Sequence, residues 1–372
     1  MSQTLALIWD AYRDLNSRRM FWIVLILSAL VAASFAAIGV TSTGFKIFTW
    51  EIPSPILNSK ELSPGDFYKS IFLNYGIGFW LTWLATVLAL ISTASLFPDF
   101  LAGGAVDLYL SKPISRLRLF LTKYACGLLF VGLQIGCFCG ASFVVIGLRG
   151  GAWEPGIFLA VPIVVLFFSY LFCFCVLIGV WTRSTVAAVL LTFLFWVFTF
   201  GVHTTEVTLL TFKLTEESAA ARLDKLIQSD QERLANWQRA KATRPTTQNS
   251  DYVTMYQNDL KSDRAKRQDM HGSFVRPHAI FYDVKTVLPK TSETVALLER
   301  MLISSARLEH VARDRQDDSE NSSAELNGNP IPMRELQAEI RSRSVGWIVG
   351  TSVGFEAVVL ALAAWIFCRR DY

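Results

Sequence analysis

Six long apolar stretches dominate this sequence and restrict what it can fold into. A hydrocarbon core about 30 Å thick is crossed by about 20 mostly apolar residues in a helix. The mean hydropathy is +0.37, and 52% of the 372 residues are hydrophobic, which is too apolar for a soluble protein of this size. We therefore predict an all-α polytopic membrane protein with six transmembrane helices. Their approximate ranges are 21–40, 75–96, 124–148, 157–181, 185–202 and 345–368.

Residues 1–20 precede the first span and have their own pattern. Apolar residues recur at three- and four-residue spacing, and Arg18 and Arg19 close the segment. This spacing is typical of an amphipathic helix, which we expect to lie on the cytoplasmic membrane surface. The segment is not a cleavable signal, because the apolar run that follows is long and no convincing small-residue cleavage site follows it.

Residues 204–344 form a polar insert between the fifth and sixth spans. An apolar stripe runs through charged residues over Thr215–Lys241 and predicts a long amphipathic helix. The segment Arg244–Arg267 is polar and suits either a loop or a second helix. We expect a mostly helical domain with a helical hairpin or a short coiled coil. Residues 345–372 supply the sixth span and the C-terminus.

The distribution of basic residues predicts the orientation. With the N-terminus inside, ten lie in inner segments and four in the two short outer loops. The ten are Arg13, Arg18, Arg19, Lys112, Arg116, Arg118, Lys123, Arg183, Arg369 and Arg370, and the four are Lys46, Lys60, Lys69 and Arg149. Lys and Arg are enriched in cytoplasmic loops, whereas long loops translocate largely regardless of charge. We expect both termini in the cytoplasm, the insert outside, and a location in the cell (inner) membrane.

The loop between the second and third spans has the most distinctive sequence motif of the chain. Gly103 and Gly104 interrupt the apolar pattern, Asp107 follows, and Lys112-Pro113 makes a second stop before Arg116. A basic loop of this kind could be a topology signal and nothing more. The run Leu110–Arg116 and the chain end Ile366–Asp371 nevertheless resemble type-2 exporter permeases of ABC transporters, including the branch associated with copper-enzyme maturation.

The resemblance implies a cytoplasmic coupling helix that binds a separate ABC ATPase subunit. The ATPase-coupling residues it implies are Gly103, Gly104, Asp107, Lys112, Pro113, Arg116 and Arg183. It also implies a dimer with a second permease copy or a related chain. The insert of residues 204–344 departs from the family, whose link between the last two spans is usually short.

The sequence contains no motif for nucleotide binding, catalysis or metal binding. There is no G-x-x-x-x-G-K-[ST] segment, so we expect this chain not to bind ATP phosphates itself and to bind no cofactor. The resemblance implies that ATP binds a partner subunit. No catalytic set and no metal-ligand cluster is visible, and the net charge of +4 needs no nucleic acid to explain it. We predict a transport subunit that is not itself an enzyme and whose partners are the ATPase, the second permease chain and the lipid bilayer.

Glu356 is an ionisable residue deep within the sixth span. An intramembrane carboxylate is costly and suggests a functional site. The structural alternative is a Glu hydrogen-bonded to a neighbouring Ser, Thr, Trp or Tyr, or kept protonated, and it could also face a dimer interface.

Together these features predict the permease subunit of an ATP-driven exporter. The alternative is an ATPase-driven mechanotransmission or envelope-scaffold protein that acts through the insert without solute transport. Neither the transported substrate nor the choice between homodimer and heterodimer follows from the sequence.

Overall fold

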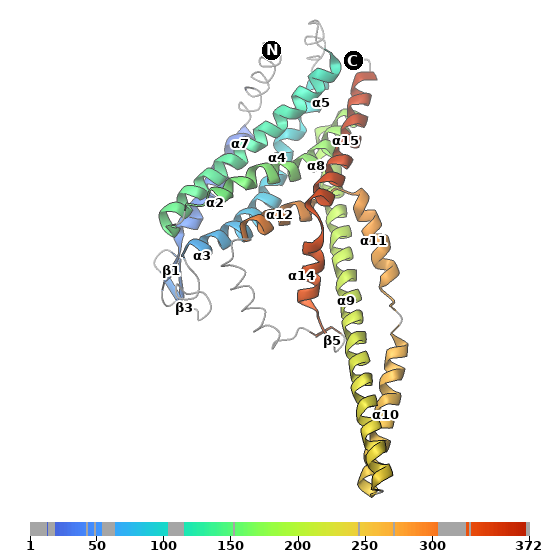
Figure 1. Cartoon of the computed structure of the whole chain (residues 1–372). Helices are drawn as coiled ribbons and strands as arrows, with labels where there is room; N and C mark the ends of the chain where they lie inside the picture. Colours follow the sequence, from blue (N-terminus) through green and yellow to red (C-terminus); the bar gives the residue numbers. More distant parts are fainter. Residues whose placement is uncertain are drawn as a thin grey trace. The chain divides into compact units, whose positions relative to one another are not determined.

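The computed structural model is mainly helical (Figure 1). It describes Arg13 and residues 19–41, 44–47, 50–53, 64–102, 115–151, 153–244, 246–270, 272–303, 325–326 and 329–369. The elements are α2 (Arg19–Ala37), β1 (Ile38–Thr41), β2 (Gly44–Ile47), β3 (Trp50–Pro53), α3 (Pro64–Ile71), η1 (Phe72–Ala85), α4 (Thr86–Ala94), α5 (Leu96–Ala102), α7 (Arg116–Gly150), η2 (Pro155–Leu159), α8 (Ala160–Thr182), α9 (Thr185–Thr243), α10 (Thr247–Asp269), α11 (Val275–Val287), α12 (Thr291–Ile303), β4 (Glu325–Leu326), β5 (Asn329–Pro330), α14 (Met333–Ser342) and α15 (Val345–Arg369).

The chain divides into two compact units, which we name by their contents. The span unit comprises Met1–Phe200, Val287–Arg313 and Val345–Tyr372. The hairpin unit comprises Gly201–Thr286 and Asp314–Ser344. The helix α9 begins in the first and ends in the second.

Six helices of the described chain are long and apolar enough to cross a membrane, which confirms the predicted number. They are Arg19–Ala37, Phe67–Leu101, Arg116–Gly150, Pro155–Thr182, Thr185–Thr243 and Val345–Arg369. Each contains one of the predicted spans, apart from the last residues of the first. The predicted amphipathic helix of residues 1–20 lies almost wholly outside the described residues.

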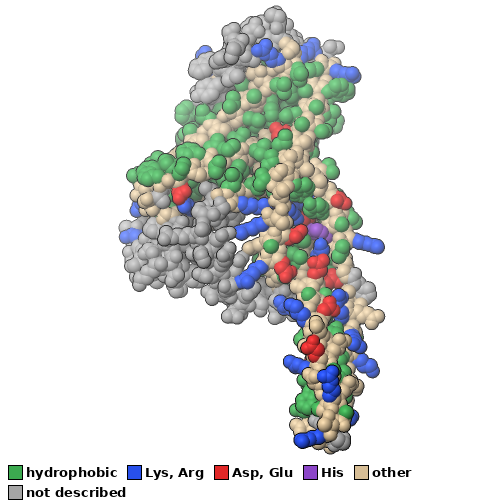
Figure 2. Space-filling view, viewed as in Figure 1, with side chains coloured by type: hydrophobic (Ala, Val, Ile, Leu, Met, Phe, Trp, Pro, Cys, Tyr) green, Lys and Arg blue, Asp and Glu red, His purple; other side chains and the backbone are tan. Residues whose placement is uncertain are grey.

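The surface of the span unit is apolar, as a lipid environment requires. Large hydrophobic side chains point outward along several spans, including Leu30, Leu148 and Val358, which are 64%, 74% and 70% exposed. Figure 2 shows hydrophobic side chains over most of the visible span surface. Exposed apolar area on this scale is rare in soluble monomers and indicates insertion into a membrane.

The helix α8 forms the centre of the span unit. Six consecutive residues of α8, from Phe168 to Cys173, are buried. Ser169 is 3% exposed, and the other five are completely buried. Consecutive residues point in all directions around a helix, so neighbours must surround α8. The helices that pack against it include α7, α15, α12, α4 and α5.

The short helix α12 belongs to the span unit, although the sequence analysis placed residues 204–344 in one insert. Leu298 is fully buried, and Thr294 is buried beside it. The segment before α12 is anchored to α15, because the Lys290 backbone N–H donates to Ser352 Oγ at 2.9 Å and Lys290 Nζ donates to Thr351 Oγ1 at 2.5 Å. The insert is therefore interrupted by residues that pack against the spans.

Two local structures differ from the expected pattern of spans and polar loops. The first span ends at Ala37, and β1 follows in an antiparallel sheet of order β1-β2-β3, so residues 38–40 are strand rather than helix. Within the second span, η1 is a π-helix of 14 residues. Thr82 Oγ1 bonds the carbonyl of Ile77, five residues earlier, at 2.7 Å, which suits the wider π-helical turn.

The hairpin unit contains the helical hairpin that the sequence suggested. The helix α9 continues without a break to Thr243, so no helix end separates the fifth span from the insert. The helix α10 pairs with it through stacked rings of Trp237 and Tyr252, whose centroids lie 4.5 Å apart. Nearer the start of the insert, Arg267 Nε donates to Asp224 Oδ1 at 2.9 Å.

Candidate functional site

The predicted coupling residues are only partly within the described chain. Gly103, Gly104, Asp107, Lys112 and Pro113 lie outside it. Arg116 and Arg183 are described, and both lie at helix ends in the span unit.

Arg116 opens α7 and links it to the end of α15. Ser115 is the N-cap of α7, and its side-chain oxygen accepts a hydrogen bond from the Arg118 backbone N–H. The Arg116 Nη1 donates to the carbonyl oxygen of Cys368 at 3.2 Å. A guanidinium is well placed there, because the last carbonyls of a helix lack intrahelical partners and carry partial negative charge.

Aromatic rings join α5 to the same contact. The Phe120 ring lies 5.1 Å from that of Phe97 and 5.6 Å from that of Phe367, measured between centroids. The ammonium of Lys123 lies 5.1 Å from the centroid of the Phe100 ring, and the Lys123 side chain is buried. We call these residues, Phe97, Phe100, Phe120, Lys123 and Phe367, the end cluster.

Arg183 closes α8 at this same end. It adopts a left-handed conformation with φ 57°, and its backbone N–H donates to the carbonyl of Gly179 at 3.0 Å. A Cβ on Gly179 would lie 3.3 Å from Pro98 Cδ, so α5 approaches the end of α8 closely. Pro98 neighbours Phe97 of the end cluster. Arg116 and Arg183, far apart in sequence, therefore lie at one end of the span unit, where Figure 1 shows α5 and the C-terminus.

Glu356 lies where α15 meets α7 and α8, and its carboxylate has two hydroxyl neighbours. Tyr124 Oη lies 2.7 Å from Oε1, and Ser169 Oγ lies 2.8 Å from Oε2. Hydrogen bonding to a Ser and a Tyr agrees with the structural alternative for this carboxylate. Each hydroxyl carries one proton, and each also lies near a backbone carbonyl: Leu166 O at 2.8 Å from Ser169 Oγ, and Ser169 O at 3.3 Å from Tyr124 Oη. A carboxylate offers about four acceptor sites, so these hydroxyls leave capacity for another donor.

A groove of about 480 Å³ opens beside Glu356. Its walls come from α7, α8 and α15, and apart from Ser169 and Glu356 they are apolar. The lining residues are Leu128, Pro162, Val165, Leu166, Ser169, Val353, Glu356, Ala357 and Leu360. Glu356 is partly buried, so its carboxylate contributes to the groove surface while bonded to Tyr124 and Ser169.

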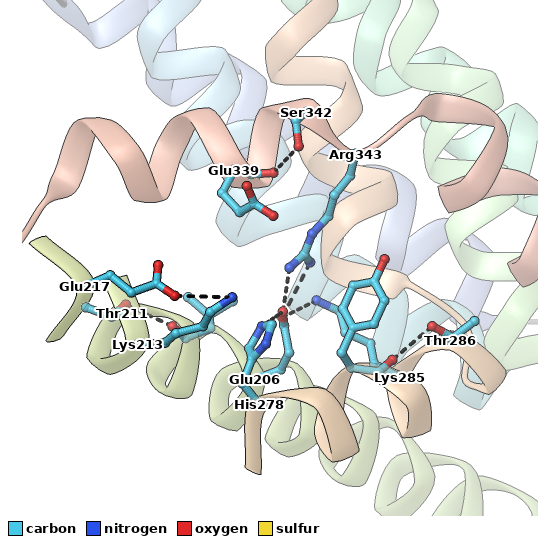
Figure 3. A network of polar contacts seen from close by, with 12 residues as sticks. Glu206, Thr211, Lys213, Glu217, His278, Lys285, Thr286, Glu339, Ser342 and Arg343 are labelled. Carbon is cyan, nitrogen blue, oxygen red and sulfur yellow. Dashed lines mark hydrogen bonds and ion pairs between the residues drawn. The ribbon is translucent and has the colours of Figure 1, made fainter. Parts of the chain in front are cut away.

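A second polar site, which the sequence analysis missed, centres on Glu206 in the hairpin unit (Figure 3). The Glu206 side chain is fully buried. Lys285 Nζ lies 2.6 Å from its Oε2, His278 Nε2 lies 3.3 Å from its Oε1, and the Arg343 guanidinium also bonds the carboxylate. These partners come from α11 and from the segment between α14 and α15. We call these four residues the Glu206 network.

The Glu206 network joins three stretches of the hairpin unit that adjoin its boundaries in the sequence, and we call these stretches the connecting segments. The hairpin unit begins at Gly201, and its two segments end at Thr286 and Ser344. Glu206 lies five residues after the first boundary, and Lys285 and Arg343 each lie one residue before theirs. One buried carboxylate thus ties together three connecting segments. The signal in the sequence was a carboxylate within the apolar run that continues past the fifth span, but nothing there identified its partners.

Comparison with protein-family models, curated proteins and solved structures finds no match for this chain.

Proposed function

We propose that this protein is the membrane-spanning permease subunit of an ATP-driven exporter. The observation that carries the proposal is the gathering of Arg116, Arg183 and the end of α15 at one end of the span unit. The resemblance to type-2 exporter permeases predicts that both arginines belong to an ATPase-binding surface. Their position at the same end of the span unit supports one docking surface, which the contact from Arg116 to Cys368 extends to the end of α15.

The same contacts offer a path by which an ATPase could move the spans. A ligand can shift a conformational equilibrium only through different contacts with the two states. An ATPase that pushes on the start of α7 would press on α15 through Arg116 and the end cluster, and on α8 through Pro98 and Gly179. The central helix α8 and the Glu356 groove would then change together.

A pulldown from the native membrane tests this proposal. Wild-type protein is expected to capture an ATPase, and the double variant Asp107→Ala/Arg116→Ala is expected to lose most of it, because two charged contacts would be removed from the docking surface. Partners are identified by mass spectrometry, and ATPase activity is assayed in the eluate.

The control is Arg149→Ala, which removes a basic residue from the last turn of the same helix α7. It should capture as much ATPase as the wild type. Equal elution volumes of all three proteins in detergent would exclude misfolding. Absence of an ATPase from the wild-type eluate, or equal capture by the double variant, would contradict the proposal.

The Glu206 network favours one alternative function, in which the hairpin unit acts on an envelope component without solute transport. Movement of any one connecting segment would be transmitted to the others through Glu206. Replacing residues 222–269 by a short linker separates the two functions, because it removes the hairpin but keeps every member of the network. If the variant still exports its substrate, the permease function is supported. If it still binds the ATPase but no longer acts on the envelope component, mechanical action by the hairpin is supported.

A further inference from the structure

The groove beside Glu356 has the composition of a binding site for an amphiphile. Its volume of about 480 Å³ falls within the range of about 300–1,000 Å³ that is usual for small-molecule sites. Such sites combine mostly apolar walls with a few polar groups that orient the ligand. Here α7, α8 and α15 supply the apolar walls, and Glu356 and Ser169 supply the polar groups.

The charge of the ligand follows from the carboxylate. Within the part of the chain that the structure describes, the partners of Glu356 are the hydroxyls of Tyr124 and Ser169, and no Lys, Arg or His forms an ion pair with it. Glu206 in the hairpin unit differs, because it has cationic partners from two segments. An ionised carboxylate at membrane depth is costly without a cation, so a ligand that supplies one is stabilised there.

The hydrogen-bonding groups beside the groove indicate which type of cation it would bind. A primary ammonium has three N–H donors. The carboxylate oxygens of Glu356 and the hydroxyl oxygen of Ser169 can accept them, because Ser169 Oγ lies 2.8 Å from Oε2. A quaternary ammonium has no N–H donor and would leave these acceptors unused.

We propose that the groove binds an amphiphile with one primary ammonium group, which pairs with Glu356 while its hydrocarbon chain lies against Leu128, Val165 and Leu360. Two sources share this chemistry: a bilayer lipid with a primary-amine headgroup, and a free lipophilic amine. Binding itself does not depend on an ATPase, but a role for this ligand as the exported substrate rests on the proposed function.

Binding of dodecylamine to the full-length protein in nanodiscs of phosphatidylcholine tests the site. Dodecanol and dodecyltrimethylammonium are the matched probes without a charge and without N–H donors. Wild-type protein is expected to bind dodecylamine at least about tenfold more tightly than either, because hydrogen bonds to a charged group are worth more than neutral ones. The measurement is isothermal titration calorimetry.

Two variants locate the site. Glu356→Gln keeps the side-chain shape and should lose at least about tenfold in dodecylamine affinity, while dodecanol affinity stays the same. Leu360→Trp keeps the carboxylate but fills the groove, so it should weaken both ligands. If Glu356→Gln does not fold, Leu360→Trp alone still tests whether the amine enters the groove. Unchanged dodecylamine binding in either folded variant overturns the proposal.

The source of the natural ligand is distinguished by a competition arm. Phosphatidylethanolamine in the nanodisc should reduce dodecylamine binding if a bilayer lipid is the ligand, whereas absence of competition would indicate a free amine. A dimer that dissociates on Glu356→Gln substitution, with no amine binding to the wild type, would show that a second copy covers the groove and would overturn the proposal. The ATPase pulldown is independent, so a failure of one test leaves the other intact.

Discussion

Replacing Glu206 by alanine is expected to lower the free energy of unfolding of the hairpin unit by about 3–5 kcal/mol. Its side chain is fully buried, and its two cationic partners, Lys285 and Arg343, have side chains only 5% and 7% exposed. Removing the carboxylate leaves these cations in a medium of low polarity without their shared anion, and that loss is the origin of the large cost. Thermal unfolding followed by circular dichroism in detergent measures the change.

The control is Glu217→Gln, on the same helix and also paired with a lysine. Its carboxylate is 55% exposed and lies 3.9 Å from Lys213 Nζ, so solvent screens the pair and the expected change is within about 0.5 kcal/mol. Equal effects of the two substitutions would contradict the argument from burial.

Replacing Glu206 and its two cationic partners by apolar residues separates their effect on stability from their effect on the transmission of movement. The triple variant Glu206→Leu/Lys285→Met/Arg343→Met removes all three charges together, and such replacements are often neutral or stabilising by about 1–4 kcal/mol. It should therefore be more stable than Glu206→Ala. If the network transmits movement between the connecting segments, and if an ATPase binds as proposed, this variant should fold and capture the ATPase but show reduced ATP-driven export.

The spans were predictable because one property, apolar length, decides whether a helix can cross a membrane. Features that depend on contacts between residues far apart in the sequence could not be predicted. The apolar residues of α12 resemble those of an amphipathic helix in the insert. Its contacts with α8, α15 and η1 show instead that α12 belongs to the span unit, where Leu298 is buried in the core. Ile38–Val40 continue an apolar run in the sequence, yet their pairing with β2 makes them strand residues.

In the candidate sites too, local features could be predicted from the sequence and long-range partners could not. Glu356 was identified from sequence because a carboxylate within an apolar span stands out, and Ser and Tyr were foreseen as partner types. Which hydroxyls bond it depends on how α7, α8 and α15 pack, so Tyr124 and Ser169 could not be named. Glu206 had a weaker signal, because the apolar run that contains it lies past the predicted end of the fifth span, at the start of the polar insert. Its partners are 72, 79 and 137 residues away, beyond any local pattern.

Gly127→Ala is expected to destabilise the span unit by about 1–3 kcal/mol, although alanine favours helices more than glycine does. A Cβ at this position would lie 2.7 Å from Cε1 and Cζ of Phe172. The Phe172 ring has little room to move, because it is fully buried and stacked on Tyr124 and Phe168 at centroid distances of 5.2 and 5.5 Å. The helices α7 and α8 must therefore separate. Unfolding of the detergent-solubilised protein by increasing denaturant measures the cost.

Gly136→Ala is the matched control, since it lies on the same helix and its added Cβ would meet nothing within 4 Å. It should be neutral or stabilising by up to about 1 kcal/mol, as expected from helix propensity alone. The Gly127 substitution should also reach Glu356, because the Tyr124 ring that stacks on Phe172 carries the hydroxyl 2.7 Å from the carboxylate. Dodecylamine affinity should therefore fall in Gly127→Ala and stay unchanged in Gly136→Ala. Equal stability of the two variants would mean that α7 and α8 accommodate the methyl group without separating, and the link to Glu356 would then have no mechanical basis.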